Sequence, residues 1–207
     1  MILLVRLSTF IYGQNGVIGC GSTHYSDNYQ PTVVKNLSDL PNFIQDSVKK
    51  HFLGKVGQDF FALLNFESGL VIDFKELIKQ DPKVFNYKWK IPRYDLSFYI
   101  SQKQSGIEYY CSRLTLDSNG VVLKQTYFPE VNFNSKNAHF DKIEHIKEVA
   151  QKNGFKTNSY SIGITENHMV LIFSRVKHKY DLTLEISAHT GQEIKHYKSK
   201  ITKQVPW

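Results

Sequence analysis

Cysteine is scarce in this chain, whose 207 residues include only Cys20 and Cys111. The sequence therefore lacks the Cys/His clustering that a structural zinc site needs. No apolar run approaches the roughly 20 residues of a bilayer-spanning helix, so we expect no transmembrane segment. No serine stands in a Gly-x-Ser-x-Gly elbow, and there is no glycine-rich phosphate loop. These absences argue against a zinc finger, a membrane-spanning protein and the familiar hydrolases and nucleotide-binding enzymes.

What the chain does contain is typical of a packed globular protein. Hydrophobic residues make up 41% of it and aromatic residues 14%, mostly Phe and Tyr, which favour strands. The formal charge is +7, from 26 basic and 19 acidic residues. The lysines are scattered rather than grouped, whereas a nucleic-acid footprint needs a clustered basic face. We therefore expect no nucleic-acid partner.

Candidate catalytic or metal-binding residues do not form a pattern. Among the eight histidines, His139 and His145 are six apart and do not share a helix face. Cys111 lies inside an apolar strand, where burial lowers the reactivity of a thiol. Glu144 and Glu148 are four apart, which is typical of a solvated helix. The sequence predicts a protein that is not an enzyme and has no cofactor, no metal site and no catalytic residue.

Residues 1–13, MILLVRLSTFIYG, resemble a secretory signal peptide with cleavage after Gly13, although Arg6 interrupts the apolar run. The alternative is an N-terminal strand from Ile2 to Tyr12. Residues 17–20 also resemble a lipoprotein cleavage box, but the segment before them is polar. We expect a periplasmic or secreted protein, with the cytoplasm as the alternative.

Export would allow Cys20 and Cys111 to form a disulfide, since they are the only two thiols. Two unpaired cysteines are the alternative. Residues 14–36 are rich in Gly, Ser, Asn and Tyr without a clear period, which indicates a lead-in or tether.

Two successive segments then show the same order of elements, a helix followed by an antiparallel meander. The first unit covers residues 37–130 and the second residues 131–207. In the first, we expect a helix from about Ser38 to Gly54, a hairpin that turns at residues 67–69, a short helix, and further strands. The strands are expected at 60–66, 70–74, 85–91, 94–100, 107–116 and 121–127.

The second unit is predicted to begin with a helix over 140–152, after a polar linker at 129–138. Strands follow at 160–164, 169–176, 180–187 and 193–201. Each unit ends in a hairpin whose turn contains glycine, at Gly120 or Gly191. The predicted fold class is α+β, with two tandem helix-on-antiparallel-sheet units.

The closing hairpin LEISAHTGQEIKHY, with the turn Thr190-Gly191-Gln192-Glu193, resembles the ending of PepSY modules, the family found in propeptides of secreted metallopeptidases. The helix FDKIEHIKEVAQKNG is similar to the leading helix of that family. The first unit matches through DSNGVVLKQ but carries an insertion near residues 74–84. A tandem of such units is similar to the fold of the secreted β-lactamase inhibitor protein.

The resemblance implies a non-catalytic binding module of the cell envelope that recognises or inhibits a peptidase or another protein. Two alternatives stay open from the residues. One is a small-ligand-binding or enzymatic α+β protein with a pocket between helix and sheet. The other is nucleic-acid binding through the basic and aromatic segment VFNYKWKIPRY, whose alternation favours a half-buried strand instead.

Overall fold

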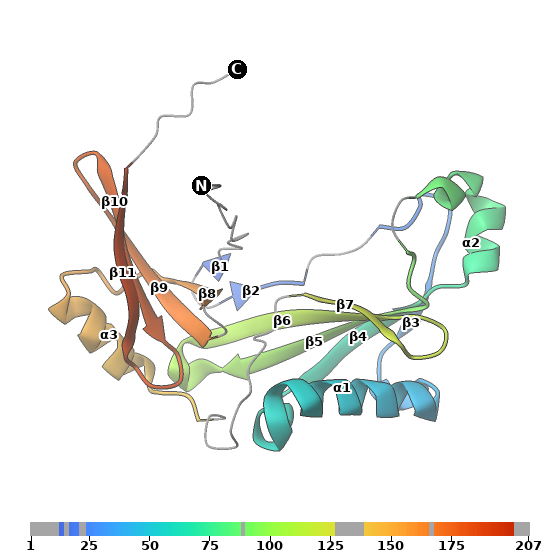
Figure 1. The fold of residues 1–207 in the computed structure, drawn as a ribbon, viewed down its shortest axis with the longest axis horizontal. Coiled ribbons are helices and arrows are strands. Elements are labelled where there is room, and N and C mark those ends of the chain that lie inside the picture. The colour runs from blue at the N-terminus through green and yellow to red at the C-terminus, as the bar shows by residue number, and fades with distance from the viewer. Residues whose placement is uncertain are drawn as a thin grey trace, which may run out of the picture.

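The computed structural model describes residues 13–14, 17–20, 24–87, 90–126, 139–165 and 168–200. Within these residues, two sheets and three α-helices make an α+β fold, as predicted (Figure 1). The elements are β1 (Gly13–Gln14), β2 (Val17–Ile18), β3 (Thr32–Val34), η1 (Leu37–Asp39), α1 (Asn42–Phe61), β4 (Asn65–Val71), α2 (Phe74–Gln80), η2 (Pro82–Asn86), β5 (Tyr94–Gln102), η3 (Lys103–Ser105), β6 (Ile107–Leu116), β7 (Val122–Thr126), α3 (Ile143–Lys152), β8 (Ser161–Thr165), β9 (His168–Lys177), β10 (Tyr180–Ser187) and β11 (Glu193–Lys200).

The first sheet has the order β2-β6-β5-β4-β3, and β7 also pairs with β6. Helix α1 lies along one face of this sheet (Figure 1). Its buried residues recur every four positions, at Ile44, Val48, Phe52, Val56 and Phe60, which is the spacing of one helix face. They pack with the alternate residues of β5 and β6 that point to the same side, so the core of this unit is filled by side chains.

The second sheet has the order β1-β8-β9-β10-β11, and α3 lies on one side of it (Figure 1). Ile146 and Ala150 of α3 are fully buried. The two units share one continuous hydrophobic cluster. The rings of Phe60 and Phe140 lie 6.1 Å apart, and Phe140 stacks on His189 at 4.4 Å, so aromatic contacts join the end of α1 to the second unit.

The closing hairpins of the two units have the same register. The pair Thr115–Lys124 is followed by Leu116–Val122, and in the second unit Glu185–Lys195 is followed by Ile186–Glu193. Each hairpin therefore has a bulge at the same place, one pair before its turn. A β-bulge is a defined local feature of a strand pair, so its occurrence at the same position in both hairpins is a specific similarity. The two hairpins are equivalent parts of two similar units.

The turn glycines are also equivalent. Gly120 has φ +78° and Gly191 has φ +66°, a region that favours glycine. A Cβ atom on Gly120 would meet Ser47 and Ile44 in the first turns of α1. One on Gly191 would meet Asp141 and His145 at the start of α3. In each unit the closing turn therefore packs on the beginning of the helix.

Several predicted elements agree with the structure, notably β6 and β10, whose bounds are those predicted, and α3 and β11 within a few residues. Others are wrong. Helix α1 continues past Gly54 to Phe61, with an irregular position at Gly57 (φ +75°). The expected turn at residues 67–69 lies inside β4, which pairs with β5 through a bulge at that point. Phe43, the second residue of α1, is 49% exposed, although its neighbour Ile44 is fully buried.

The described residues from Val84 to Tyr87 and from Lys90 to Arg93 do not form the half-buried strand that the alternation of this segment indicates. Residues 82–86 form η2, since Pro82 follows the capping residue Asp81 and fits the first helical turn. Phe85 is 73% exposed and Tyr87 is 39% exposed. The lead-in also differs from a tether, because Tyr25 and Tyr29 are buried and β3 pairs with β4.

The predicted signal peptide, apart from Gly13, and the linker at 129–138 lie outside the described residues. None of the described helices is long and apolar enough to cross a membrane.

Candidate functional site

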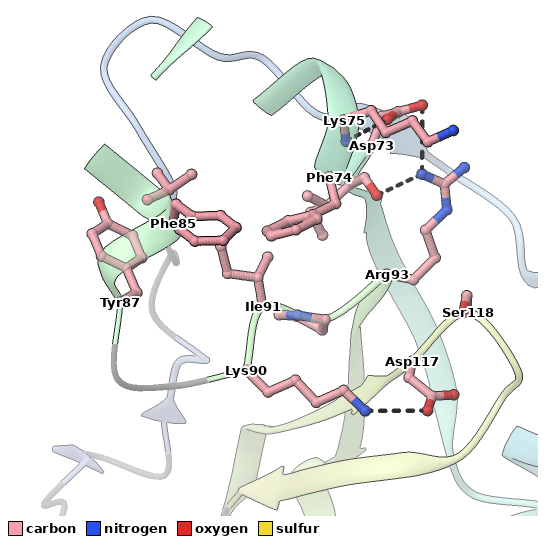
Figure 2. A pocket seen from close by; sticks show the side chains of 13 residues that line it. Asp73, Phe74, Lys75, Phe85, Tyr87, Lys90, Ile91, Arg93, Asp117 and Ser118 are labelled. Carbon is pink, nitrogen blue, oxygen red and sulfur yellow. Dashed lines mark hydrogen bonds and ion pairs between the residues drawn. The ribbon is translucent and has the colours of Figure 1, made fainter. Parts of the chain in front are cut away.

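A pocket of about 600 Å³ opens where α2, η2 and residues 90–93 meet the turn that begins at Asp117. We call it the aromatic pocket, because Phe74, Phe85 and Tyr87 line it. Figure 2 shows the Phe74 and Phe85 rings side by side above Ile91, with Tyr87 beyond Phe85. All three aromatic side chains are more than a third exposed, and large apolar groups gathered on a surface mark interaction sites in many proteins.

Local sequence signals hold these rings in place. Asp73 caps α2, and its Oδ1 accepts hydrogen bonds from the backbone N–H groups of Lys75 at 3.0 Å and Glu76 at 3.2 Å. Phe74 is the first residue of that helix and points outward. Asp81 caps η2 in the same way, with Lys83 N–H 3.2 Å from its Oδ1.

A small second cluster of buried residues supports the pocket from below. It contains Tyr25, Tyr29, Ile72, Leu77 and Val84. The Tyr29 hydroxyl accepts a hydrogen bond from Asp73 N–H at 2.6 Å, so the lead-in is fixed directly to the start of α2. The pocket is therefore built by three parts of the chain that are distant in sequence.

Charged groups surround the apolar floor. Arg93 donates to the carbonyl of Ile72 at 2.6 Å and lies 3.8 Å from the Asp73 carboxylate. Lys90 Nζ is 3.3 Å from Asp117 (Figure 2). Backbone N–H donors, chiefly that of Glu76, lower the pKa of Asp73 below 3.8, and Arg93 adds to the effect. The pKa of Asp117 is lowered mainly by the hydrogen bond from the backbone N–H of Val121. The N–H of Asn119 and the ammonium group of Lys90 add to the effect.

Both carboxylates of the pocket are thus already bonded within the protein. The lining residues have a net charge of +1, from the three cations Lys75, Lys90 and Arg93 and the two carboxylates Asp73 and Asp117. The rim can therefore accept an anionic group beside an apolar one.

A second pocket of about 470 Å³ shares Lys90 and Pro92 with the first. Its floor contains Asp95, which is 3% exposed. Arg113 Nε donates to Asp95 Oδ1 at 2.9 Å, and Arg113 also pairs with Oδ2, to which the Tyr25 hydroxyl donates. This buried pair holds the lead-in on the outer face of the first sheet.

Cys20 and Cys111 are joined by a disulfide, with their Cα atoms 5.1 Å apart. Cys20 follows β2 and Cys111 lies in β6, so the bond ties the lead-in to the sheet. A sulfur that forms this bond cannot carry a lipid, which disfavours Cys20 as a lipidation site.

Glu67, at the bulge of β4, lies 3.6 Å from Cys111 Sγ and accepts a hydrogen bond from the Tyr109 hydroxyl. Burial, and then this carboxylate, raise the pKa of Tyr109.

Within the described part of the chain, Cys20, Glu67 and Cys111 form the one group whose ligand atoms could hold a metal. The disulfide uses both sulfurs, so the group does not suit a metal in this form. The histidines are separated. His145 pairs with Asp141, and His189 Nδ1 lies 3.0 Å from the His139 carbonyl. The position of Glu67 beside the disulfide could not be predicted from the sequence, because residues 67–69 were expected to form a turn.

Comparisons with known proteins place the chain in no family. No protein-family model matches it, and no curated protein matches it. A crystal structure of a protein described as a candidate lipoprotein from Clostridium difficile 630 is 12% identical, with 73% of this chain and 90% of that chain covered. Its TM-score is 0.26, a likeness too low to carry an argument.

Proposed function

We propose that this protein is a non-catalytic binding module of the cell envelope or the secreted fraction, and that the aromatic pocket receives a segment of a protein or peptide partner. The observation that carries the proposal is the convergence of Phe74, Phe85 and Tyr87 on one site, beside two helical turns that Asp73 and Asp81 cap. Aromatic residues are enriched in the centres of protein interfaces.

The rings give the pocket its binding energy. Full burial of a Phe side chain contributes about 1.5–3 kcal/mol relative to exposure. Phe85, at 73% exposed, has most of that contribution still available, and Phe74 at 45% has about half. A large apolar side chain of the partner fits between them, and a neighbouring carboxylate fits the excess positive charge from Lys75, Lys90 and Arg93. The expected partner segment therefore combines an aromatic or aliphatic residue with an acidic one.

The compartment is supported by the signal-like start and by the Cys20–Cys111 disulfide, because such bonds persist in oxidising compartments. The PepSY resemblance of the closing hairpins points to the same class of module. The alternative, a ligand or active site between helix and sheet, is disfavoured in the first unit. There the inward side chains of α1 are 0–1% exposed against the sheet, which leaves that interface filled.

The proposal is tested by site-specific photo-cross-linking in the native cells. A photoreactive phenylalanine at position 85 should give an adduct with one protein, and the same group at position 43 should not. Phe43 is a matched control, since it is an exposed aromatic residue on α1. The adduct protein is then purified and its dissociation constant measured. Phe85→Ser should weaken binding by tenfold or more, as loss of about 1.5 kcal/mol predicts. Equal adducts at 85 and 43 would refute the proposal.

A further inference from the structure

The free end of the second sheet carries a group of cations that the aromatic pocket does not involve. β9 and β10 are joined by a turn at His178 and Lys179, and β11 ends beside them. The register places Lys177, Tyr180 and Lys200 in one row across the three strands, and Arg175, Leu182 and Lys198 in the next row on the same face. Side chains two residues apart on a strand share a face. We call this the basic end: Arg175, Lys177, Lys179, Lys198 and Lys200.

The basic end has an unbalanced charge. Asp181 is the only acidic residue within 175–182 and 198–200, and its row, with Val176 and Ser199, points to the opposite face. Arg175 is engaged inside the protein, since it donates to the Gly154 carbonyl and lies 4.8 Å from the Phe155 ring. Lys177, Lys179 and Lys200 are exposed, and the described residues give them no ion pair.

Apolar groups flank the turn on both faces of the hairpin. Tyr180, in the row of Lys177 and Lys200, is 37% exposed, and Val176, on the opposite face, is 70% exposed. Lys198 Nζ lies 3.5 Å from the centre of the Tyr180 ring. A tyrosine whose face is covered by an ammonium group is a poor platform for stacking a nucleic-acid base, which needs that face. An amphipathic tyrosine, an exposed aliphatic residue and long lysines are instead the side chains that suit a bilayer interface.

We propose that the basic end docks the protein on an anionic phospholipid bilayer. The lysines contact the lipid phosphates, and Val176 and Tyr180 enter the headgroup region. The hairpin from β9 to β10 projects away from the first sheet, and α2 and η2, which line the aromatic pocket, lie at the other end of the molecule (Figure 1). Docking would leave that pocket accessible. The basic end shares no residue with the aromatic pocket, so membrane docking and partner binding can be tested separately.

The expected affinity follows from the charge. Each lysine near an anionic surface contributes about a fivefold increase in binding, so three contribute about a hundredfold. The attraction acts within a Debye length of about 8 Å at physiological salt, so binding should weaken as salt is added.

Sedimentation of the full chain with vesicles tests this. The chain should bind vesicles of phosphatidylcholine and phosphatidylglycerol in equal parts, and should not bind phosphatidylcholine alone. The triple variant Lys177→Gln, Lys179→Gln, Lys200→Gln should bind the anionic vesicles about a hundredfold more weakly. The matched control Lys35→Gln, Lys49→Gln, Lys50→Gln has the same net charge. Its exposed positions follow β3 or lie on α1, away from the basic end, so its affinity for the vesicles should change little. Val176→Ser should weaken the binding that persists at high salt.

Equal losses in the two triple variants would contradict the proposal, because a general charge effect would then explain the binding. Failure to bind the anionic vesicles would also overturn it. So would preferential binding of a single-stranded oligonucleotide that the first triple variant abolishes, since this would assign the basic end to nucleic acid.

Discussion

Replacing the two turn glycines with alanine tests whether both units are built in the same way. Gly120→Ala and Gly191→Ala each place a Cβ in a left-handed conformation, which costs about 1–2 kcal/mol for a residue other than glycine. At Gly120 the new Cβ would also lie 2.6 Å from Ser47 Oγ and 3.3 Å from Ser47 Cβ. The hydroxyl can rotate away, but the Cβ cannot. At Gly191 the Cβ would collide with Asp141, whose Oδ1 accepts from Lys142 N–H at 2.8 Å. We expect each variant to lose about 1.5–3 kcal/mol of unfolding free energy.

Urea unfolding monitored by circular dichroism measures these losses from the midpoint at constant slope. Gly54→Ala is the matched control, because Gly54 is an exposed residue inside α1 with nothing within 4 Å of a new Cβ. It should stabilise the protein by about 0.5–1 kcal/mol, since glycine is unfavourable within a helix. Adding Ser47→Ala should recover part of the Gly120→Ala loss. An unchanged midpoint for either glycine variant would refute the equivalent packing of turn on helix.

Three further outcomes are expected. When the unaltered protein is unfolded without reductant, neither cysteine should react with iodoacetamide. Cys111→Ser should lower the free energy of unfolding by about 4.6 kcal/mol, given the 91-residue separation that the bond closes; two reactive thiols would contradict this. Arg113→Met should cost about 3–5 kcal/mol because it leaves the Asp95 carboxylate buried without that partner, and the double variant with Asp95→Leu should recover much of the loss; additive losses would argue against the pair. The lowered pKa of Asp73 means that its contribution is complete above its unfolded value of 3.8 and is lost as pH falls through the folded pKa. Asp73→Asn should therefore make the urea midpoint less sensitive to acid, and an unchanged pH profile would contradict the capping role.

The repeated architecture could be predicted because the apolar residues of its strands and helices recur with a regular local period. Alternation over Ile107–Leu116 and Tyr180–Ser187 gave strands with the observed bounds, since one face of each is buried against a helix. The glycines of both closing turns were visible for the same reason. Gly54 predicted a helix end, but burial of Val56 and Phe60 carries α1 beyond it. Tertiary packing overrides the propensity of a single exposed glycine.

The candidate site could not be predicted in this way. In VFNYKWKIPRY the apolar residues alternate as in a strand, but Asp81 and Pro82 start a 3₁₀ turn that leaves Phe85 in solvent. The aromatic pocket also needs Tyr25, Tyr29 and Asp117, which no periodic signal connects. Glu67 reaches Tyr109 and the disulfide only because β4 bulges where a turn was expected. Contacts between distant segments decided each of these features.

We propose the aromatic pocket as the binding surface of this protein. The most direct measurement compares the dissociation constants of Phe85→Ser and Phe43→Ser for the protein that cross-links at position 85. We expect Phe85→Ser to bind tenfold or more weakly, and Phe43→Ser to bind as tightly as the unaltered protein. Equal affinities for the two variants would contradict it.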